Sequence, residues 1–205
     1  EKSGAHGITI HLREDRRHIR DQDLKRLKAE ITLPINLEMA ATPEMLKIAL
    51  ETKPNAVCIV PEKRQEVTTE GGLDAVKNSD ILTQMTNELH DQGIRVSLFI
   101  DPEESQIHQA KKIGADIIEL HTGEFCNQQG AKQKSELQRI TTSAQLAASL
   151  NLECHAGHGL NYETAKIISQ IPEIIELNIG HFLIGEAVFE GLSSAIKKMQ
   201  QAIER

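Results

Sequence analysis

The chain is almost devoid of aromatic side chains: they make up 2% of its 205 residues, and tryptophan is absent. The chain therefore has almost no aromatic side chains that could stack on nucleic-acid bases or anchor it at a membrane surface. The apolar runs are only a few residues long, far short of the roughly 20 residues that a bilayer-spanning helix needs. The composition predicts a soluble protein that binds neither membranes nor nucleic acids.

Cysteine is scarce as well. Cys58, Cys126 and Cys154 are an odd number without a C-x-x-C pair, which argues against a disulfide framework and predicts a reducing, cytoplasmic location. Lys and Arg total 23 against 30 Asp and Glu, a formal net charge of −7. A negative net charge does not favour binding to nucleic acid in general, but it permits a local basic pocket. We expect a small metabolite as the partner.

The length suits one globular domain over residues 1–205. Seven short runs rich in Ile, Val and Leu predict strands at Gly7–Leu12, Ile35–Met39, Ala56–Val60, Arg95–Ile100, Asp116–Leu120, Leu152–Ala156 and Ile174–Ile179. Spaced apolar positions predict helices at Pro43–Leu50, Leu73–His90, Glu103–Lys112, Ser135–Leu150, Tyr162–Ser169 and Leu192–Ile203. The alternation of strands and helices predicts a parallel α/β sheet.

A doubly wound open sheet and a closed TIM (β/α)8 barrel both fit this alternation. In four strands, polar residues occupy one face and apolar residues the other: Thr9 and His11, Asn36 and Glu38, Glu119 and His121, Glu176 and Asn178. An interior that becomes polar toward the carboxyl ends of the strands favours the barrel. A barrel needs eight strands and seven are found, while residues 1–6 resemble a helix tail. We therefore expect that the first barrel strand is missing from this chain.

Several of these strand ends carry candidate catalytic groups. His11 and Arg13 precede a charged loop that contains His18, and they suit proton exchange and phosphate binding, although a solvated loop fits equally. Glu38 lies on an inward face, where desolvation would raise its pKa and make it a base; the alternative is a structural ion pair. Glu119 and His121 suit charge positioning, metal binding or pairing with each other.

Two glycine-containing segments follow the last two predicted strands. The first, His155–Leu160, places His158 where it could move a proton, although a tight turn would also use these glycines. The second, Asn178–His181, suits a phosphate cradle beside a helix N-terminus. The polar loop Pro61–Asp74 is either a lid or an ordinary surface loop.

Seven segments together resemble the pyridoxine 5′-phosphate synthase family, in the order ITIHLREDRRHI, NLEMA, VPEKRQEVTTEGGLD, VSLFID, IELHTG, AGHGL and ELNIGH. The resemblance implies an enzyme without metal or other cofactor. Its expected reaction joins 1-deoxy-D-xylulose 5-phosphate to 3-amino-2-oxopropyl phosphate and releases inorganic phosphate and water. A homo-oligomer is also implied.

The same resemblance implies the roles of individual residues. His11, Glu38 and His158 are expected to be the acid–base residues, and Glu119 to stabilise a charged transition state. The expected contacts to the two phosphorylated substrates are Arg13, His18 and Thr68 for the deoxyxylulose phosphate, and Gly159, Gly180 and His181 for the aminoketone phosphate. The chain departs from the family in having His155 where an Asn is usual, and in lacking the family's first strand, which contributes an Asn, an Asp-His pair and an Arg to the substrates.

Two other functions fit the residues. A metal-dependent barrel lyase or isomerase acting on a phosphorylated sugar would use His11, Glu38, Glu119, His121 and His158 as ligands. A non-catalytic barrel that binds phosphorylated metabolites would leave the proton carriers idle. The presence of all three carriers argues against this second alternative.

Overall fold

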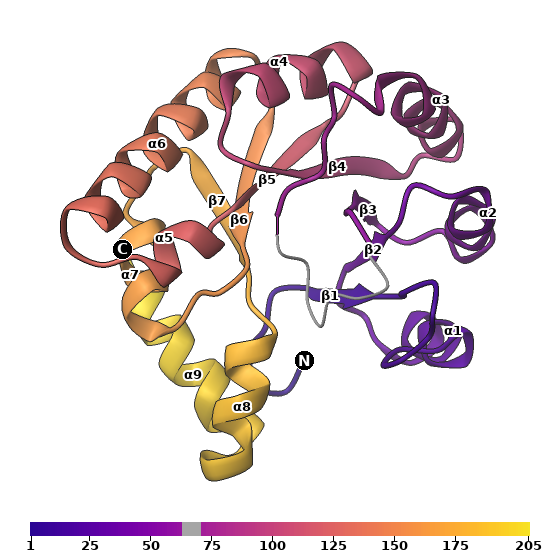
Figure 1. Ribbon diagram of the computed structural model, residues 1–205. Helices are drawn as coiled ribbons and strands as arrows, with labels where there is room; N and C mark the ends of the chain where they lie inside the picture. Colours follow the sequence, from indigo (N-terminus) through magenta and orange to yellow (C-terminus); the bar gives the residue numbers. More distant parts are fainter. Residues whose placement is uncertain (63–70) are drawn as a thin grey trace.

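The computed structural model describes residues 1–62 and 71–205 and shows one curled parallel sheet surrounded by helices (Figure 1). The strands pair in the order in which they occur in the chain: β1 (Ile8–His11), β2 (Ile35–Met39), β3 (Ala56–Ile59), β4 (Arg95–Ile100), β5 (Ile117–His121), β6 (Glu153–Gly157) and β7 (Ile174–Asn178). The expected seven consecutive parallel strands of a TIM-type barrel are confirmed.

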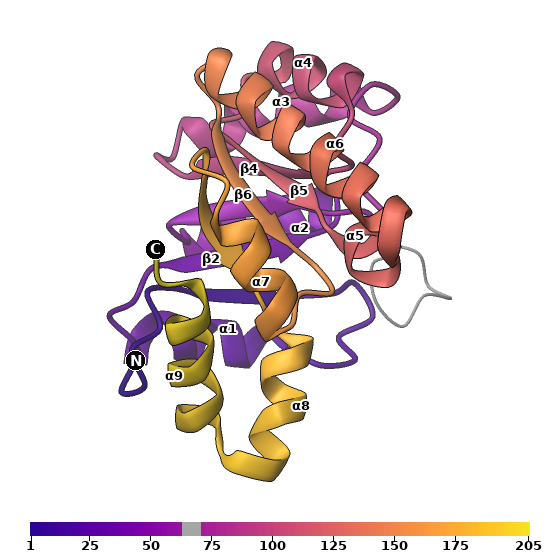
Figure 2. The ribbon, with the colours of Figure 1, turned by 90° about the vertical axis from the view of Figure 1, so that its left-hand side faces the viewer.

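The helices lie on the outside of the sheet (Figures 1 and 2). They are α1 (Asp21–Glu30), α2 (Pro43–Thr52), α3 (Ser79–His90), α4 (Glu104–Ile113), α5 (Gly123–Asn127), α6 (Gly130–Ser149), α7 (Tyr162–Ser169), α8 (His181–Glu190) and α9 (Leu192–Ile203). Local signals set their ends: the Thr42 side chain accepts from the Met45 backbone N–H at the start of α2, and α4 ends at Gly114 with φ of 92°.

Three helices were not predicted, and two predicted ones differ in their bounds. The region predicted as Leu73–His90 is helical only from Ser79, and α6 begins at Gly130 instead of Ser135. In α1 only Leu24 is fully buried, α5 is a single short turn, and α8 buries no residue. In α1 the apolar Leu24 and Leu27 stand among charged residues, α5 is too short to show a helical period, and the apolar residues of α8 form no buried stripe.

The apolar core lies between the sheet and the helices. Side chains that alternate along each strand explain this: Ile35, Leu37 and Met39 of β2 are buried on the helix side, while Asn36 and Glu38 point to the inside of the curl. A second, small apolar cluster of Cys58, Val60 and Phe99 fills part of the inside. The remaining inner positions are polar toward the carboxyl ends of the strands.

The curl is open between β1 and β7. Among the described residues, no backbone ladder joins these two strands, and a side-chain hydrogen bond from Thr9 Oγ1 to Asn178 Oδ1, 2.6 Å long, spans the opening instead. Nearby, α8 exposes apolar side chains, including Ile184, Val188 and Phe189, the last of them 89% exposed. Four of the large apolar side chains on or beside α8 are thus exposed: Ile184, Val188, Phe189 and Leu192.

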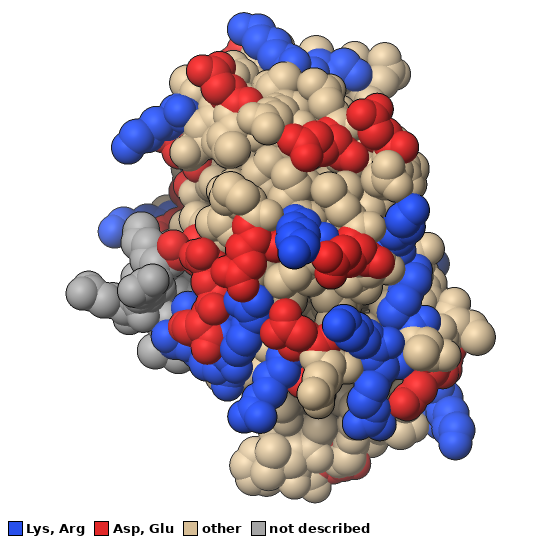
Figure 3. Space-filling model, turned by 90° about the vertical axis from the view of Figure 1, so that its right-hand side faces the viewer, with Lys and Arg blue, Asp and Glu red and all other residues tan. Residues whose placement is uncertain are grey.

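The outer surface mixes charges of both signs. Figure 3 shows Lys and Arg side chains interspersed with Asp and Glu across the face that carries α1 and α2, without a broad region of one sign. Among the helices of the described ranges, none combines the length and the apolar content needed to cross a bilayer.

Candidate active site at the carboxyl ends of the strands

His11 at the end of β1 lies between two carboxylates. Its Nδ1 is 3.6 Å from Glu38 Oε2 on the neighbouring strand, and its Nε2 is 2.8 Å from Glu62 Oε1 just after β3. Glu62 is itself held by the Glu14 backbone N–H, which donates to Oε2 over 3.1 Å. The two flanking carboxylates fix the orientation of the His11 ring.

Glu38 combines burial with this contact to His11. Desolvation raises the pKa of the Glu38 carboxyl above its ordinary value, and the charge of His11 partly opposes that shift. The pair therefore suits proton exchange near neutral pH. Glu62 was missed from the sequence; its place directly after a strand end was the signal that could have identified it.

Glu119 on β5 is only 2% exposed. Its Oε2 accepts from Asn178 Nδ2 over 2.9 Å and from the Cys58 thiol over 3.8 Å. Burial raises the pKa of Glu119 well above its usual range, and the charges of Glu38 and Glu176 add to this. A neutral carboxylic acid is thus favoured, and this form has a proton to donate.

The strand beside Glu119 approaches it closely. A Cβ at Gly157 would collide with Glu119 Oε1, so the position requires glycine. The next residue, His158, has a φ of +78°, which is rare for a residue with a side chain and marks backbone strain at a site that holds it in place. Thr122 Oγ1 lies 2.7 Å from the His158 carbonyl and 2.8 Å from that of Gly157, which pins this turn.

His158 lies in a cluster of rings. Its ring centroid is 5.1 Å from that of His121 and 6.5 Å from that of Phe99. Burial lowers the pKa of His158, and the charges of His121 and His181 lower it further. The neutral imidazole that results can accept a proton at neutral pH.

His121 does not pair with Glu119, which was one of the interpretations of the sequence. Its Nδ1 lies 3.0 Å from Asp101 Oδ1 at the end of β4, and the Gly72 backbone N–H donates to the same oxygen over 3.1 Å. Glu119 and His121 are two residues apart on β5, yet their side chains have different partners: Asn178 for Glu119 and Asp101 for His121.

Arg13 is 5% exposed, and its guanidinium is already occupied. Its Nε and Nη2 donate to the two carboxylate oxygens of Asp15 over 3.2 and 3.3 Å, and this contact holds the pKa of Asp15 well below its usual range. A phosphate at Arg13 would have to displace or join Asp15. His18 is exposed on the same loop, whereas Thr68 lies outside the described residues, as does most of the loop considered as a lid.

The segment after β7 leads directly into a helix. α8 begins at His181 with Gly180 as its N-cap, and both residues are exposed, as is Gly159 in the neighbouring turn. The first backbone N–H groups of a helix lack intrahelical acceptors and attract anions. His181 is close enough to act electrostatically on His158.

His155 belongs to a separate charged group on the inner face. Its Nε2 lies 2.8 Å from Glu153 Oε1; its buried Nδ1 is 3.3 Å from Glu176 Oε1 but makes no hydrogen bond. Glu153 in turn receives Arg95 Nη2 over 2.7 Å. These contacts give His155 a structural role within the sheet. In the described ranges, no three His, Cys, Asp or Glu side chains are arranged to hold a metal ion.

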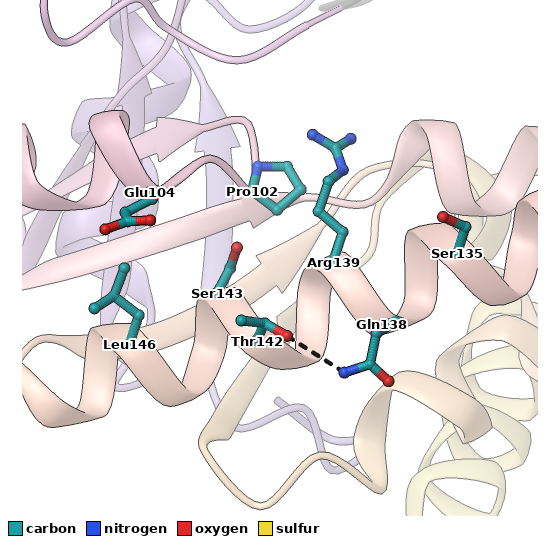
Figure 4. A pocket seen from close by; sticks show the side chains of 8 residues that line it. All are labelled: Pro102, Glu104, Ser135, Gln138, Arg139, Thr142, Ser143 and Leu146. Carbon is teal, nitrogen blue, oxygen red and sulfur yellow. Dashed lines mark hydrogen bonds between the residues drawn. The ribbon is translucent and has the colours of Figure 1, made fainter.

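A hollow of about 400 Å³ lies on the outside, between the start of α4 and α6 (Figure 4). None of the predicted site residues lines it: its walls are Pro102, Glu104, Ser135, Gln138, Arg139, Thr142, Ser143 and Leu146. Arg139 Nη2 is paired with Glu136 over 2.7 Å. The candidate chemistry therefore belongs to the strand ends and not to this outer hollow.

Comparisons with known proteins agree on one family. The family model described as "Pyridoxal phosphate biosynthesis protein PdxJ" matches residues 1–205. The "Pyridoxine 5'-phosphate synthase" of Zymomonas mobilis subsp. mobilis is 58% identical over 202 residues, covering 98% of this chain and 79% of that protein. The protein of the same name from Rhodopseudomonas palustris is 55% identical over 208 residues, covering 100% of this chain and 82% of its own.

Solved structures support the fold at low sequence identity. The 3-hexulose-6-phosphate synthase of Salmonella typhimurium superimposes with a TM-score of 0.64 at 11% identity, covering 89% of this chain and 79% of that one. Thiamine phosphate pyrophosphorylase from Pyrococcus furiosus gives 0.62 at 12% identity, covering 98% and 84%. At such identities the likeness concerns the fold alone.

Proposed function

The chain belongs to the pyridoxal phosphate biosynthesis protein PdxJ family, and from this membership we propose that it acts as a pyridoxine 5′-phosphate synthase. It condenses 1-deoxy-D-xylulose 5-phosphate with 3-amino-2-oxopropyl phosphate, closes the pyridine ring and releases inorganic phosphate and water. The relatives above 50% identity that carry this name over nearly the whole chain support the assignment.

The observation that carries this function is the set of proton carriers at one end of the sheet. Imine formation, enolisation, loss of water and loss of phosphate each move protons, and no single side chain serves all of them. We assign the exchange of protons to His11 with Glu38 on one side of the mouth and to neutral His158 on the other. Their opposite pKa tendencies, raised for Glu38 and lowered for His158, support an acid and a base that work near the same pH.

Glu119 has a different task in this proposal. As a buried neutral acid it donates a hydrogen bond to negative charge that develops on the substrate, where a carboxylate would repel it. Asn178 and Cys58 hold the carboxyl group in place through Oε2. The other oxygen, Oε1, packs directly against Gly157, where any side chain would collide with it.

The two phosphate groups are assigned to the two loop regions of the mouth. Gly159, Gly180 and His181 would hold the aminoketone phosphate, since α8 begins there. Arg13, His18 and Thr68 would hold the deoxyxylulose phosphate. The Arg13 guanidinium is held in place by its two hydrogen bonds to Asp15, a contact that the phosphate would displace or join.

Further proposals concern the setting of the enzyme. We place it in the cytoplasm, which agrees with its three free cysteines, two of them buried. We also propose a homo-oligomer, supported by the exposed apolar side chains of α8, because contiguous apolar surface of this kind marks protein contacts. Sedimentation velocity would report a monomer if this second proposal is wrong.

The test is formation of pyridoxine 5′-phosphate from the two substrates by purified protein, with and without a chelator. Glu38→Gln should retain substrate binding and lose about 10²–10⁴-fold in turnover, since glutamine keeps the shape but accepts no proton. Glu30→Gln, at the exposed end of α1, is the control and should have parental activity. Loss of activity on chelation would favour the metal-dependent alternative, and binding without turnover by the parent protein would favour the non-catalytic one.

A further inference from the structure

Thr122 has no part in the function proposed above, yet its side chain is turned toward the segment that carries His158. The residue lies between β5 and α5 and is 0% exposed. It occupies the N-cap of α5, where a threonine hydroxyl ordinarily accepts a backbone N–H of the first helical turn. Here the side chain makes no such bond. The hydroxyl therefore serves another partner than its own helix.

The partners of the hydroxyl are two carbonyl groups of the turn after β6. Thr122 Oγ1 lies 2.7 Å from the carbonyl oxygen of His158 and 2.8 Å from that of Gly157, so one proton is shared between two acceptors. The Thr122 backbone N–H also donates to the Gly157 carbonyl over 2.9 Å. The described structure records one other donor to the His158 carbonyl, the weakly donating Cys126 thiol at 3.9 Å. The hydroxyl is thus the main partner of that carbonyl.

The turn itself is strained. His158 has a φ of +78° and Gly159 a φ of +79°, so two successive residues adopt the left-handed region. Glycine does so readily, whereas a residue with a side chain stays there only where neighbouring contacts enforce it. The φ of His158 is the rotation between its own carbonyl carbon and that of Gly157. A single group bonded to both carbonyls restricts this rotation directly.

The start of α5 leaves room for the turn and its imidazole. A Cβ on Gly123 would lie 3.1 Å from His158 Cδ2, and a Cβ on Gly159 would lie 3.2 Å from Cys126 Cβ. Both distances are shorter than ordinary carbon contacts, so two missing side chains let the turn lie directly against α5. The position of the imidazole therefore follows from how the turn is held on this helix.

We propose that Thr122 is a positioning residue for His158: its hydroxyl, shared between the Gly157 and His158 carbonyls, holds the turn in the left-handed conformation that places the imidazole at the mouth. Thr122 acts through His158 and does not touch the substrate. The catalytic consequence rests on the proposed function, whereas the conformation of the turn is a property of the free protein.

The first experiment measures the turn in the full chain without substrate. The three-bond coupling between the amide and α protons of His158 depends on φ and is read by NMR from isotope-labelled protein. Thr122→Val keeps the size and branching of the side chain and removes its hydroxyl, so the coupling should change. Thr122→Ser keeps the hydroxyl and should have the parental coupling. An unaltered coupling in Thr122→Val would overturn the proposal, because the turn would then hold without the hydroxyl.

Activity measurements test the catalytic consequence. Thr122→Val should lower kcat by about 10–10²-fold with little change in KM, since a misplacement of about 1 Å can cost this much. Thr122→Ser should restore most of the turnover. In a chain that already carries His158→Ala, Thr122→Val should have little further effect on kcat, because the two residues act as a unit. An equal loss of kcat in both backgrounds would overturn the proposal, since Thr122 would then act independently of His158.

Thr86→Val is the matched control. Thr86 on α3 is also 0% exposed, and its Oγ1 has no hydrogen-bond partner among the described residues. The same substitution there should leave the His158 coupling and kcat at parental values. If Thr122→Val does not fold, as judged by circular dichroism, Thr122→Cys takes its place. Its thiol is a weaker donor, so both quantities should change in the same directions; parental values of both would overturn the proposal.

The two experiments separate this inference from the proposed function. If the His158 coupling changes as expected but the parent protein makes no pyridoxine 5′-phosphate, the positioning role stands and the proposed function fails. If the parent makes this product and Thr122→Val turns over at the parental rate, the proposed function stands and the positioning role fails.

Discussion

Glu119→Gln should make the protein more stable at neutral pH, although it replaces a residue of the candidate site. The side chain is 2% exposed, and burial together with nearby carboxylates raises its pKa well above the ordinary value. The folded protein therefore holds a proton there that the unfolded chain releases above about pH 4.3. Glutamine has the same shape, still accepts from Asn178 through its oxygen, and needs no proton.

The magnitude follows from linkage. Each pH unit between the unfolded and the folded pKa costs the folded state about 1.4 kcal/mol. Over the interval from about pH 4.3 to about pH 7, this slope sets an upper limit of about 4 kcal/mol on the expected gain. The sign is that of a raised acid: the contribution of Glu119 is most favourable below the unfolded pKa and is lost as the pH rises toward the folded pKa.

Urea unfolding at several pH values measures this effect. The free energies of unfolding of parent and Glu119→Gln should nearly coincide at about pH 4 and diverge steadily toward about pH 7. Glu30→Gln, on the exposed end of α1, should show no such divergence. A difference between Glu119→Gln and parent that does not change with pH would mean that Glu119 is ionised in the folded protein, and the role of neutral hydrogen-bond donor would then be refuted.

Three further outcomes are expected. Glu62→Gln keeps an acceptor for the Glu14 backbone but loses the charge beside the His11 ring, so kcat should fall by about tenfold or more with little change in KM; an unaltered kcat would contradict the contact's importance. Asp15→Asn weakens the internal partner of the guanidinium at position 13, so calorimetry should show tighter binding of inorganic phosphate, and weaker binding would show that Asp15 helps to hold the anion. Iodoacetamide at about pH 8 should leave Cys58 unmodified in the native protein, by mass spectrometry, because burial raises its pKa well above the usual value.

The strands and the polar interior were predictable because their signal is local. In segments such as Ile35–Met39, apolar and polar residues alternate, and this alternation predicts which side chains face inward. Parallel pairing of the strands then brings their carboxyl ends together. That is why His11, Glu38, Glu119 and His158 could be placed at one end of the sheet from the order of residues alone.

The pairings within the site were not predictable in this way. The contact of Asp101 with His121 depends on how β4 and β5 are aligned and on the direction of two side chains, which no spacing reveals. The hydrogen bond from Arg13 to Asp15 depends on the path of the loop that contains both residues. The helix α8 was missed because its apolar residues are distributed around the helix and none is buried.

The chain order of the strands has a consequence for how the protein is made. Each strand pairs with the one synthesised just before it, so the sheet can grow from β1 onward while the ribosome is still at work. His11 and Glu38 then take their places early, whereas His158 follows β6 and His181 follows the final strand, β7. A nascent chain interrupted after β5 would already carry His11, Glu38 and Glu119 on a paired sheet, yet it would lack His158 and the start of α8. The set of proton carriers is therefore incomplete in a partial translation product until β6 has been synthesised and His158 has followed it.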